Sequence, residues 1–455
     1  MTSYTLSLLN SKLKELDEWR DSFGSFEIDD SQKVSSDKIE DVFSQLIDRL
    51  KGNYPFHHPQ YAGQMLKPPH DLAWAAYALA MTINPNNHAL DGGPPSSEME
   101  KEVIADLARM VGFGDTYLGH LTSSGTIANL EALWVARSSH PGKSIAYSAA
   151  AHYTHSRMCQ VLGVKGVEIP VNSHGVMDVD ALKNVSDDIG TVVVTLGTTG
   201  MGLMEDLPEI LDYCKKNKIR VHVDSAYGGF YKLLSGHPLM RGPVWDVVDQ
   251  CDSFVVDPHK HGLQPYGCGC VLFRDPAVGK FYKHDSPYTY FSSDELHLGE
   301  ISLECSRAGA AAVALWTTLQ LFPLKAKEGL GLILEQCLVA AIDFYKALKE
   351  SDHYEPVLKP DLDIVVYFPL GDNMTTSDIS RRSNDIFSVG MKDKEKGLHL
   401  SLFRLESSFF AEHFPDIKID SESVTVLRSV MMKPEHRLFV PELMQRLEQL
   451  WEQTH

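Results

Sequence analysis

Hydrophobic residues recur at helical spacing through the first fifty residues, where charged residues separate them. The apolar positions of this arm are Leu13, Leu16 and Trp19, followed by Val42, Leu46 and Leu50. Such a period predicts amphipathic helices. A helix of this kind cannot bury its apolar stripe alone, so we expect the arm to pack on the main body or on a partner.

Further along the chain, short runs rich in β-branched residues alternate with helical stretches. Helices are predicted over 70–83 and 98–111, before this change. Strands are predicted over 144–148, 191–195, 221–224 and 254–257, with helices over 126–138 and 207–218 between them. The alternation is typical of a parallel sheet that helices cover on both faces. A run over 271–274 follows so closely that we expect an antiparallel addition.

The last third of the chain has a different organisation. A long helix is predicted over 308–322, and strand-like runs at 363–368, 398–404 and 423–428 alternate with amphipathic helices. We therefore expect a helical N-terminal arm over 1–75, a large α/β domain over 76–330 and a small α+β domain over 331–455.

Composition narrows the class of protein. The chain has 455 residues, 43% of them hydrophobic, and a formal net charge of −19, which argues against a broad nucleic-acid surface. Its seven cysteines form no C-x-x-C motif, and we expect them to be reduced. There is no basic, apolar leader at the start and no apolar run of about 18 residues. We expect a cytoplasmic protein without a membrane span.

Polar residues follow two of the predicted strands directly. Asp224 ends the first strand, and Asp257-Pro-His-Lys260 follows the second. In open α/β sheets, ligands bind at the carboxyl ends of the strands. Alone, Asp224 could cap a helix and Lys260 could be solvated. Together, a carboxylate and a His-Lys pair at neighbouring strand ends indicate an electrophilic cofactor.

These motifs resemble those of the group II pyridoxal-phosphate-dependent amino-acid decarboxylases. The Asp-Pro-His-Lys signature and the preceding Asp-x-Ala carry the likeness, which extends in motif order over residues 55–330. More faintly, residues 426–430 are similar to the last strand of the family. The resemblance implies a fold-type-I architecture with a mainly parallel sheet, pyridoxal 5'-phosphate as cofactor, and loss of CO2 from an L-amino acid.

The resemblance also implies roles for single residues. Lys260 would hold the cofactor as a Schiff base, and Asp224 would keep its pyridine nitrogen protonated. His152 would stack on the ring, with His155 as the competing choice. Ala226, two residues after Asp224, and His259, directly before Lys260, are further expected cofactor contacts.

A second group of residues is expected around the phosphate. Ser124, Gly125 and Thr126 open a predicted helix, where free amides and the helix dipole favour an anion. Thr199, in a loop after a strand, would lie near the imine. Ser306 is a candidate contact across a subunit boundary, because its segment resembles one that reaches a neighbouring subunit's phosphate in the lyase branch of the family.

Substrate contacts are less sharply defined. Tyr61 and Gln64 lie in a segment that resembles the substrate pocket of the family, and Arg307 could bind substrate or be structural. Tyr288 and Tyr290 both fall where the family has a mobile loop whose tyrosine returns the proton after CO2 leaves. The two pocket residues point to different substrates, with a slight preference for an aromatic amino acid.

Other functions remain as alternatives. A carbon–carbon lyase of the sphingosine-phosphate type, an aldehyde-forming decarboxylase variant and a non-catalytic family member share these motifs in part. A nicotinamide dehydrogenase would need G-x-G-x-x-G, a zinc peptidase H-E-x-x-H and a serine hydrolase G-x-S-x-G, and the chain has none of them. The resemblance further implies a homodimer with shared active sites.

Overall fold

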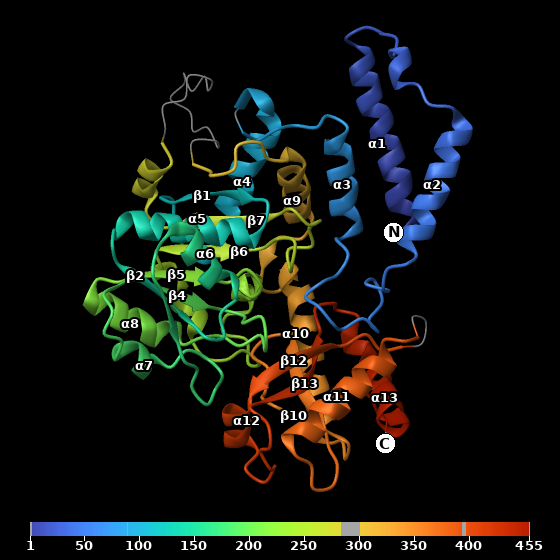
Figure 1. The fold of residues 1–455 in the computed structure, drawn as a ribbon. Coiled ribbons are helices and arrows are strands. Elements are labelled where there is room, and N and C mark those ends of the chain that lie inside the picture. The colour runs from blue at the N-terminus through green and yellow to red at the C-terminus, as the bar shows by residue number, and fades with distance from the viewer. Residues whose placement is uncertain (1, 89, 284–300, 394–396, 455) are drawn as a thin grey trace.

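The computed structural model describes residues 2–88, 90–283, 301–393 and 397–454. Its two N-terminal helices, α1 (Ser3–Asp21) and α2 (Ser36–Leu50), form a hairpin beside α3 (Asp71–Met81), as Figure 1 shows. The helices expected in the arm are therefore confirmed. α2 buries none of its residues, so its apolar stripe faces outward.

The centre of the large domain is a seven-stranded sheet in the order β1-β7-β6-β5-β4-β2-β3. β7 runs antiparallel to both β1 and β6, and the other strands are mutually parallel. The mainly parallel fold class and the antiparallel addition are confirmed. The strands are β1 (Leu118–Thr122), β2 (Ser144–Ser148), β3 (Gly166–Ile169), β4 (Ile189–Thr195), β5 (Arg220–Asp224), β6 (Ser253–Val256) and β7 (Gly269–Phe273).

Helices pack around this sheet (Figure 1), whose strands other than the edge strand β3 are almost entirely buried. They are α4 (Pro94–Val111), α5 (Gly125–Ser139), α6 (Thr154–Leu162), α7 (Val179–Lys183), α8 (Leu207–Asn217) and α9 (Gly309–Leu321). α4 begins earlier than predicted because Pro94 and Pro95 suit the first helical positions, where no amide donor is needed. None of the helices in the described part of the chain has the length and apolar character that a membrane crossing requires.

The small domain, from α10 to α13, has its own antiparallel sheet in the order β10-β11-β13-β12. Its elements are α10 (Leu330–Lys349), β10 (Tyr354–Pro356), β11 (Ile364–Pro369), α11 (Thr376–Gly390), β12 (Ser401–Glu406), α12 (Ser407–His413), β13 (Ser423–Val430) and α13 (His436–Thr454). A separate apolar core lies between this sheet and helices α10, α11 and α13. The predicted α+β unit at the C-terminus is therefore confirmed.

The topology fixes where a ligand site can lie. Because β1, β2, β4, β5 and β6 share one direction, their carboxyl ends meet at a single edge of the sheet. Asp224 ends β5 at this edge, and Lys260 lies in the loop that follows β6.

Candidate active site

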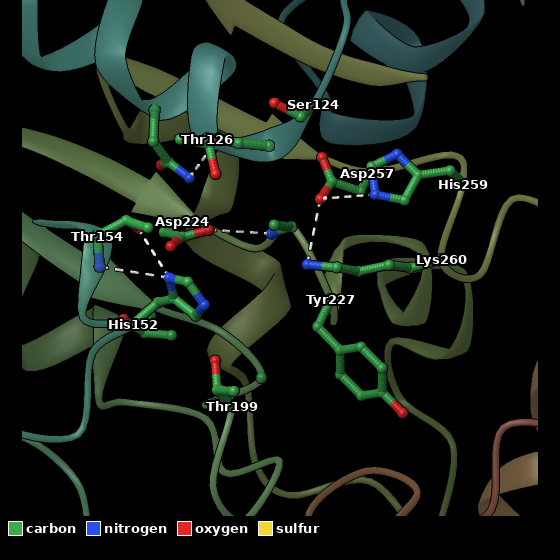
Figure 2. Close-up of a pocket in the computed structure, with 15 residues that line it drawn as sticks. Ser124, Thr126, His152, Thr154, Thr199, Asp224, Tyr227, Asp257, His259 and Lys260 are labelled. Atoms are coloured by element: carbon green, nitrogen blue, oxygen red, sulfur yellow. Dashed lines mark hydrogen bonds and ion pairs between the residues drawn. The ribbon is translucent and has the colours of Figure 1, made fainter. Parts of the chain in front are cut away.

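A cavity of about 180 Å³ opens at the carboxyl edge of the large sheet. Its wall is formed by loops that follow β1, β2, β4, β5 and β6 (Figure 2). Of the residues singled out from the sequence, it brings together Ser124, Gly125, Thr126, His152, Thr199, Asp224, Ala226, His259 and Lys260. Residues from five separate segments thus converge on one small volume.

Asp224, the last residue of β5, is held as an anion at the base of the cavity. Its Oδ2 lies 2.7 Å from Nε2 of His155, and its Oδ1 accepts a hydrogen bond from the amide of Ala226. Burial alone would raise the pKa of Asp224, but the hydrogen bond and charge of His155, with further help from His222 and Lys260, hold it well below its usual range. A buried carboxylate kept ionised in this way suits a cationic ring nitrogen.

The first turn of α5 forms a second wall of the cavity. Ser124 caps this helix, since its hydroxyl accepts from the amide of Ile127, while the first amides of a helix have no intrahelical acceptor. A side chain at Gly125 would place its Cβ 2.4 Å from Asp257 Oδ2. Glycine is therefore required for the close approach of helix and strand, and the exposed helix dipole favours an anion there.

A buried chain of hydrogen bonds holds that turn from behind. Nε2 of His222 lies 2.8 Å from Oδ1 of Asn129, whose amide donates to the carbonyl of Gly125. On the other side, the imidazole Nδ1 lies 2.9 Å from the hydroxyl of Ser253. Burial lowers the pKa of His222 to about 3, so the ring is neutral and can donate to one neighbour while it accepts from the other.

Lys260 extends into the cavity from the turn after β6. Its Nζ lies 3.1 Å from Oδ2 of Asp257, which is itself 3.5 Å from Nε2 of His259 (Figure 2). The imidazole of His259 is fixed in turn, because its Nδ1 lies 2.7 Å from the carbonyl of Cys268. The amine is thus presented at the cavity with a carboxylate that keeps its end oriented.

A wider cavity of about 950 Å³ adjoins the first one. His152, Thr199 and Lys260 line both, so the lysine can be reached from the wider space. Burial lowers the pKa of His152 and leaves its imidazole neutral. Gln64 lies in the wall of the wider cavity, as do residues of β12 from the small domain.

Several residues singled out from the sequence lie away from both cavities. Tyr61 is buried and stacks against Tyr54, while Ser306 accepts a hydrogen bond from Asn86. Arg307 forms an ion pair of 2.6 Å with Glu100 and donates to the carbonyl of Leu121, which is a structural placement. The candidates Tyr288 and Tyr290 lie outside the described residues.

Three further residues make contacts around the site that the sequence pattern does not assign to them. On the sequence, His155 competes with His152 for one role, but the structure places His152 in the cavity wall and His155 against Asp224. Asp257 appears in the sequence only as the first residue of the Asp-Pro-His-Lys motif, and the structure places its carboxylate against Lys260. Arg428, on β13, donates to the carbonyls of Gly63, Thr199 and Gly200; only its place in the tail motif could have drawn notice.

The residues present fit pyridoxal phosphate. Asp224 offers an anion for the ring nitrogen, α5 offers free amides for the phosphate, and Lys260 offers an amine for the aldehyde. Oγ1 of Thr195 is buried beside them with no hydrogen-bond partner among the described residues, which leaves a donor for a bound group. Fold and site together define an α/β enzyme that uses this cofactor.

Comparison with known proteins agrees and narrows the class. The model of the pyridoxal-dependent decarboxylase conserved domain matches residues 26–369, so the chain belongs to this family. It is a pyridoxal-phosphate-dependent amino-acid decarboxylase, a carboxy-lyase.

Named relatives and solved structures are similar over most of the chain. An L-tyrosine decarboxylase of Enterococcus faecium is 26% identical, with 75% of this chain and 74% of the relative covered. An L-aspartate/L-glutamate decarboxylase of Pyrococcus horikoshii is 27% identical, with 72% and 84% covered. The fold is similar to that of mouse CSAD (TM-score 0.77, 19% identity, 95% and 91% covered) and of Oryza sativa TDC with PLP and tryptamine (TM-score 0.79, 16% identity, 100% and 99% covered).

Proposed function

We propose that Lys260 is the residue that attaches the cofactor, and that Asp224 is the anion that stabilises its ring. The observation that carries the proposal is their convergence: both line one cavity, and each has a buried partner that fixes it, Asp257 for the amine and His155 for the carboxylate. A solvated lysine or a helix-capping aspartate would have neither feature.

Each side chain has one task in the reaction. When bound, pyridoxal phosphate supplies an aldehyde for covalent attachment and a ring that accepts electrons. The first turn of α5 binds the phosphate through its amides, with Ser124, Gly125 and Thr126 at the contact. His152 and Thr199 line both cavities, so His152 would contact the ring and orient it, and Thr199 would contact it on the side of the wider cavity. Asp224 holds a proton on the ring nitrogen, with His155 fixing the carboxylate.

The same residues account for selectivity toward loss of CO2. Orientation of the bond to be broken and charge stabilisation are the main sources of rate. We place the α-carboxylate of the substrate toward the wider cavity, beside Lys260 and the loop at Thr199. Arg428 keeps that loop in place through its donated hydrogen bonds.

Substitution of Lys260 tests the assignment. Lys260→Arg keeps a cation beside Asp257 but cannot form a C=N bond to the cofactor, and we expect no detectable CO2 release and no absorbance near that of a lysine-bound cofactor. Lys260→Ala is expected to behave in the same way, with its melting temperature as the control for folding. Turnover by either variant at a rate near that of the unaltered protein would refute the assignment.

We propose an L-amino acid with a large aromatic side chain as substrate. Supporting this, the wider cavity has the volume for such a group, and Leu66, Met201, Phe403 and Phe409 contribute to its wall. The curated relatives carry names of tyrosine, aspartate and glutamate decarboxylases. CO2 release from a panel of L-amino acids tests this, and preference for aspartate or glutamate over tyrosine would overturn it.

We propose a homodimer in which α2 covers a second copy of the chain. Support comes from the outward stripe of α2, where Val42, Phe43, Leu46, Ile47 and Leu50 are all exposed and together form more apolar surface than single exposed residues. A Phe43→Asp, Leu46→Asp variant is expected to sediment as a monomer. The matched control Ser44→Asp adds charge off the stripe, and it is expected to leave the dimer intact.

The cysteines support a reducing compartment, which we take to be the cytoplasm. All seven are free in the structure, and six of them are buried. Burial raises the pKa of Cys159 to about 11 and that of Cys214 to about 12, so their thiols are unreactive. Fractionation of cells that produce the protein tests this, and recovery with a membrane or secreted fraction would contradict it.

A further inference from the structure

A buried polar cluster lies behind the cavity, where the small domain meets the large one. At its centre is Asp363, a fully buried residue that directly precedes β11. Its Oδ1 accepts a hydrogen bond of 2.6 Å from the hydroxyl of Tyr227, and its Oδ2 lies 3.2 Å from Nε2 of His261. The ring of His261 also packs edge-on against those of Tyr227 and Tyr231.

The charge of this cluster is well defined. Burial opposes ionisation of Asp363, but His261 and the two tyrosine hydroxyls lower its pKa, so the carboxyl is an anion. Burial likewise lowers the pKa of His261, which leaves that imidazole neutral. The arrangement is an anion that accepts a hydrogen bond from Tyr227 and lies 3.2 Å from the neutral imidazole of His261, with Lys67 and Arg428 as the nearby cations.

Both partners of Asp363 belong to the segments that form the active site. His261 is the residue after Lys260, and Tyr227 follows Ala226 in the loop after Asp224. Tyr227 itself lines the small cavity, whereas Asp363 does not. Asp363 is anchored independently, because its carbonyl accepts from the amide of Met431 on the small domain. Asp363 of the small domain therefore contacts the residue next to Lys260 in the large domain.

We propose that Asp363 is a positioning residue for Lys260, acting through His261. The carboxylate fixes the imidazole, the imidazole fixes the turn at residues 257–261, and the turn sets where Nζ of Lys260 lies. The role of Asp363 is in attachment of the cofactor rather than in its non-covalent binding. This inference rests on the assignment of Lys260 as the attachment residue.

Two forms of the cofactor separate these two kinds of binding. With pyridoxal phosphate, the neutral amine of Lys260 adds to the aldehyde carbon, a C=N bond forms and the aldehyde oxygen leaves as water. Pyridoxine phosphate has an alcohol in place of the aldehyde, so it uses only the ring and phosphate contacts. The ratio of the two dissociation constants, measured on the cofactor-free full chain, reports how well Lys260 is placed.

The expected pattern follows from which contact each variant removes. In Asp363→Asn and His261→Leu, pyridoxal phosphate is expected to bind about tenfold more weakly or worse, because a charge-assisted contact is lost, with pyridoxine phosphate changed by no more than about twofold. His261→Gln keeps a donor amide and is expected to recover most of the loss. Asp361→Asn is the matched control, since Asp361 contacts Met204 and Arg241 rather than His261.

The outcomes are distinguishable. If both dissociation constants rise together in Asp363→Asn, or neither changes, the positioning role is wrong. If His261→Gln is as weak as His261→Leu, the path through His261 is wrong. If the unaltered protein binds both forms equally and no bond to Lys260 forms, the attachment assignment itself fails, whatever the variants show.

Discussion

Replacement of His155 by leucine tests whether Asp224 acts as a fixed anion. The contact between His155 and Asp224 is 2.7 Å long, and the side chains are 0% and 7% exposed. A hydrogen bond to a buried charged group is worth about 1.5–3 kcal/mol. Leucine fills a similar volume without a donor, so among the residues that the structure describes the carboxylate keeps the hydrogen bond from the amide of Ala226.

The expected loss can be stated as a rate. At about 1.4 kcal/mol for each factor of ten, we expect kcat/KM for CO2 release from the preferred amino acid to fall by ~10- to 150-fold. His155→Gln retains an N–H donor and is expected to lose less than His155→Leu. Melting temperatures of the cofactor-loaded proteins control for unfolding.

If His155→Leu, still folded and loaded, keeps kcat/KM within about threefold of the unaltered enzyme, then Asp224 does not depend on its buried partner. The ring nitrogen would then have to be stabilised by another group.

Three further predictions follow from the same region. Burial raises the pKa of Glu205 to about 7, so the stabilising contribution of its protonated form is present below the usual carboxyl pKa and is lost as the pH rises through about 7. Relative to Glu205→Gln, we expect the unfolding free energy of the unaltered protein, measured by denaturant titration, to fall by about 2 kcal/mol between pH 5 and 8. Parallel pH curves for the two proteins would contradict this. Gly125→Ala places a Cβ against Asp257, and we expect the cofactor affinity, measured by absorbance titration, to fall at least about tenfold. An unchanged affinity would show that the close approach of Gly125 to Asp257 does not require glycine. Arg428→Lys cannot donate hydrogen bonds to Gly63, Thr199 and Gly200 together, so we expect KM to rise several-fold with little change in melting temperature. A fall in melting temperature that accompanies the rise in KM would indicate a purely structural role.

Much of the fold was predictable because the central strands are buried on both faces. Runs of β-branched residues such as 191–195, which reads Thr-Val-Val-Val-Thr, are strong local signals, and this run lies within a strand of the structure. β1 and β3 were not predicted. Residues 118–122 read Leu-Gly-His-Leu-Thr and 166–169 read Gly-Val-Glu-Ile, so glycine and polar residues interrupt the pattern, and tertiary pairing rather than propensity makes them strands.

The site divides along a similar line. Residues that follow strands directly, such as Asp224 and Lys260, could be predicted to converge because parallel strands end at one edge. His155 and Asp363 could not, since each gains its role from a side-chain contact across a long sequence separation. The histidines at 152 and 155 show what sequence spacing cannot decide. The spacing favours His152 alone, but in the structure His152 lines the cavity and His155 contacts Asp224.

Reduction with borohydride, followed by peptide mapping, tests whether the cofactor is attached at Lys260. We expect a single pyridoxyl group on the peptide that contains Lys260, and none in Lys260→Ala. Lys433 is the lysine to compare, because burial lowers its pKa to about 7, but its Nζ is buried and donates to the carbonyl of Tyr61 rather than lining either cavity. A label on Lys433, on any other lysine, or on no lysine at all would contradict the account.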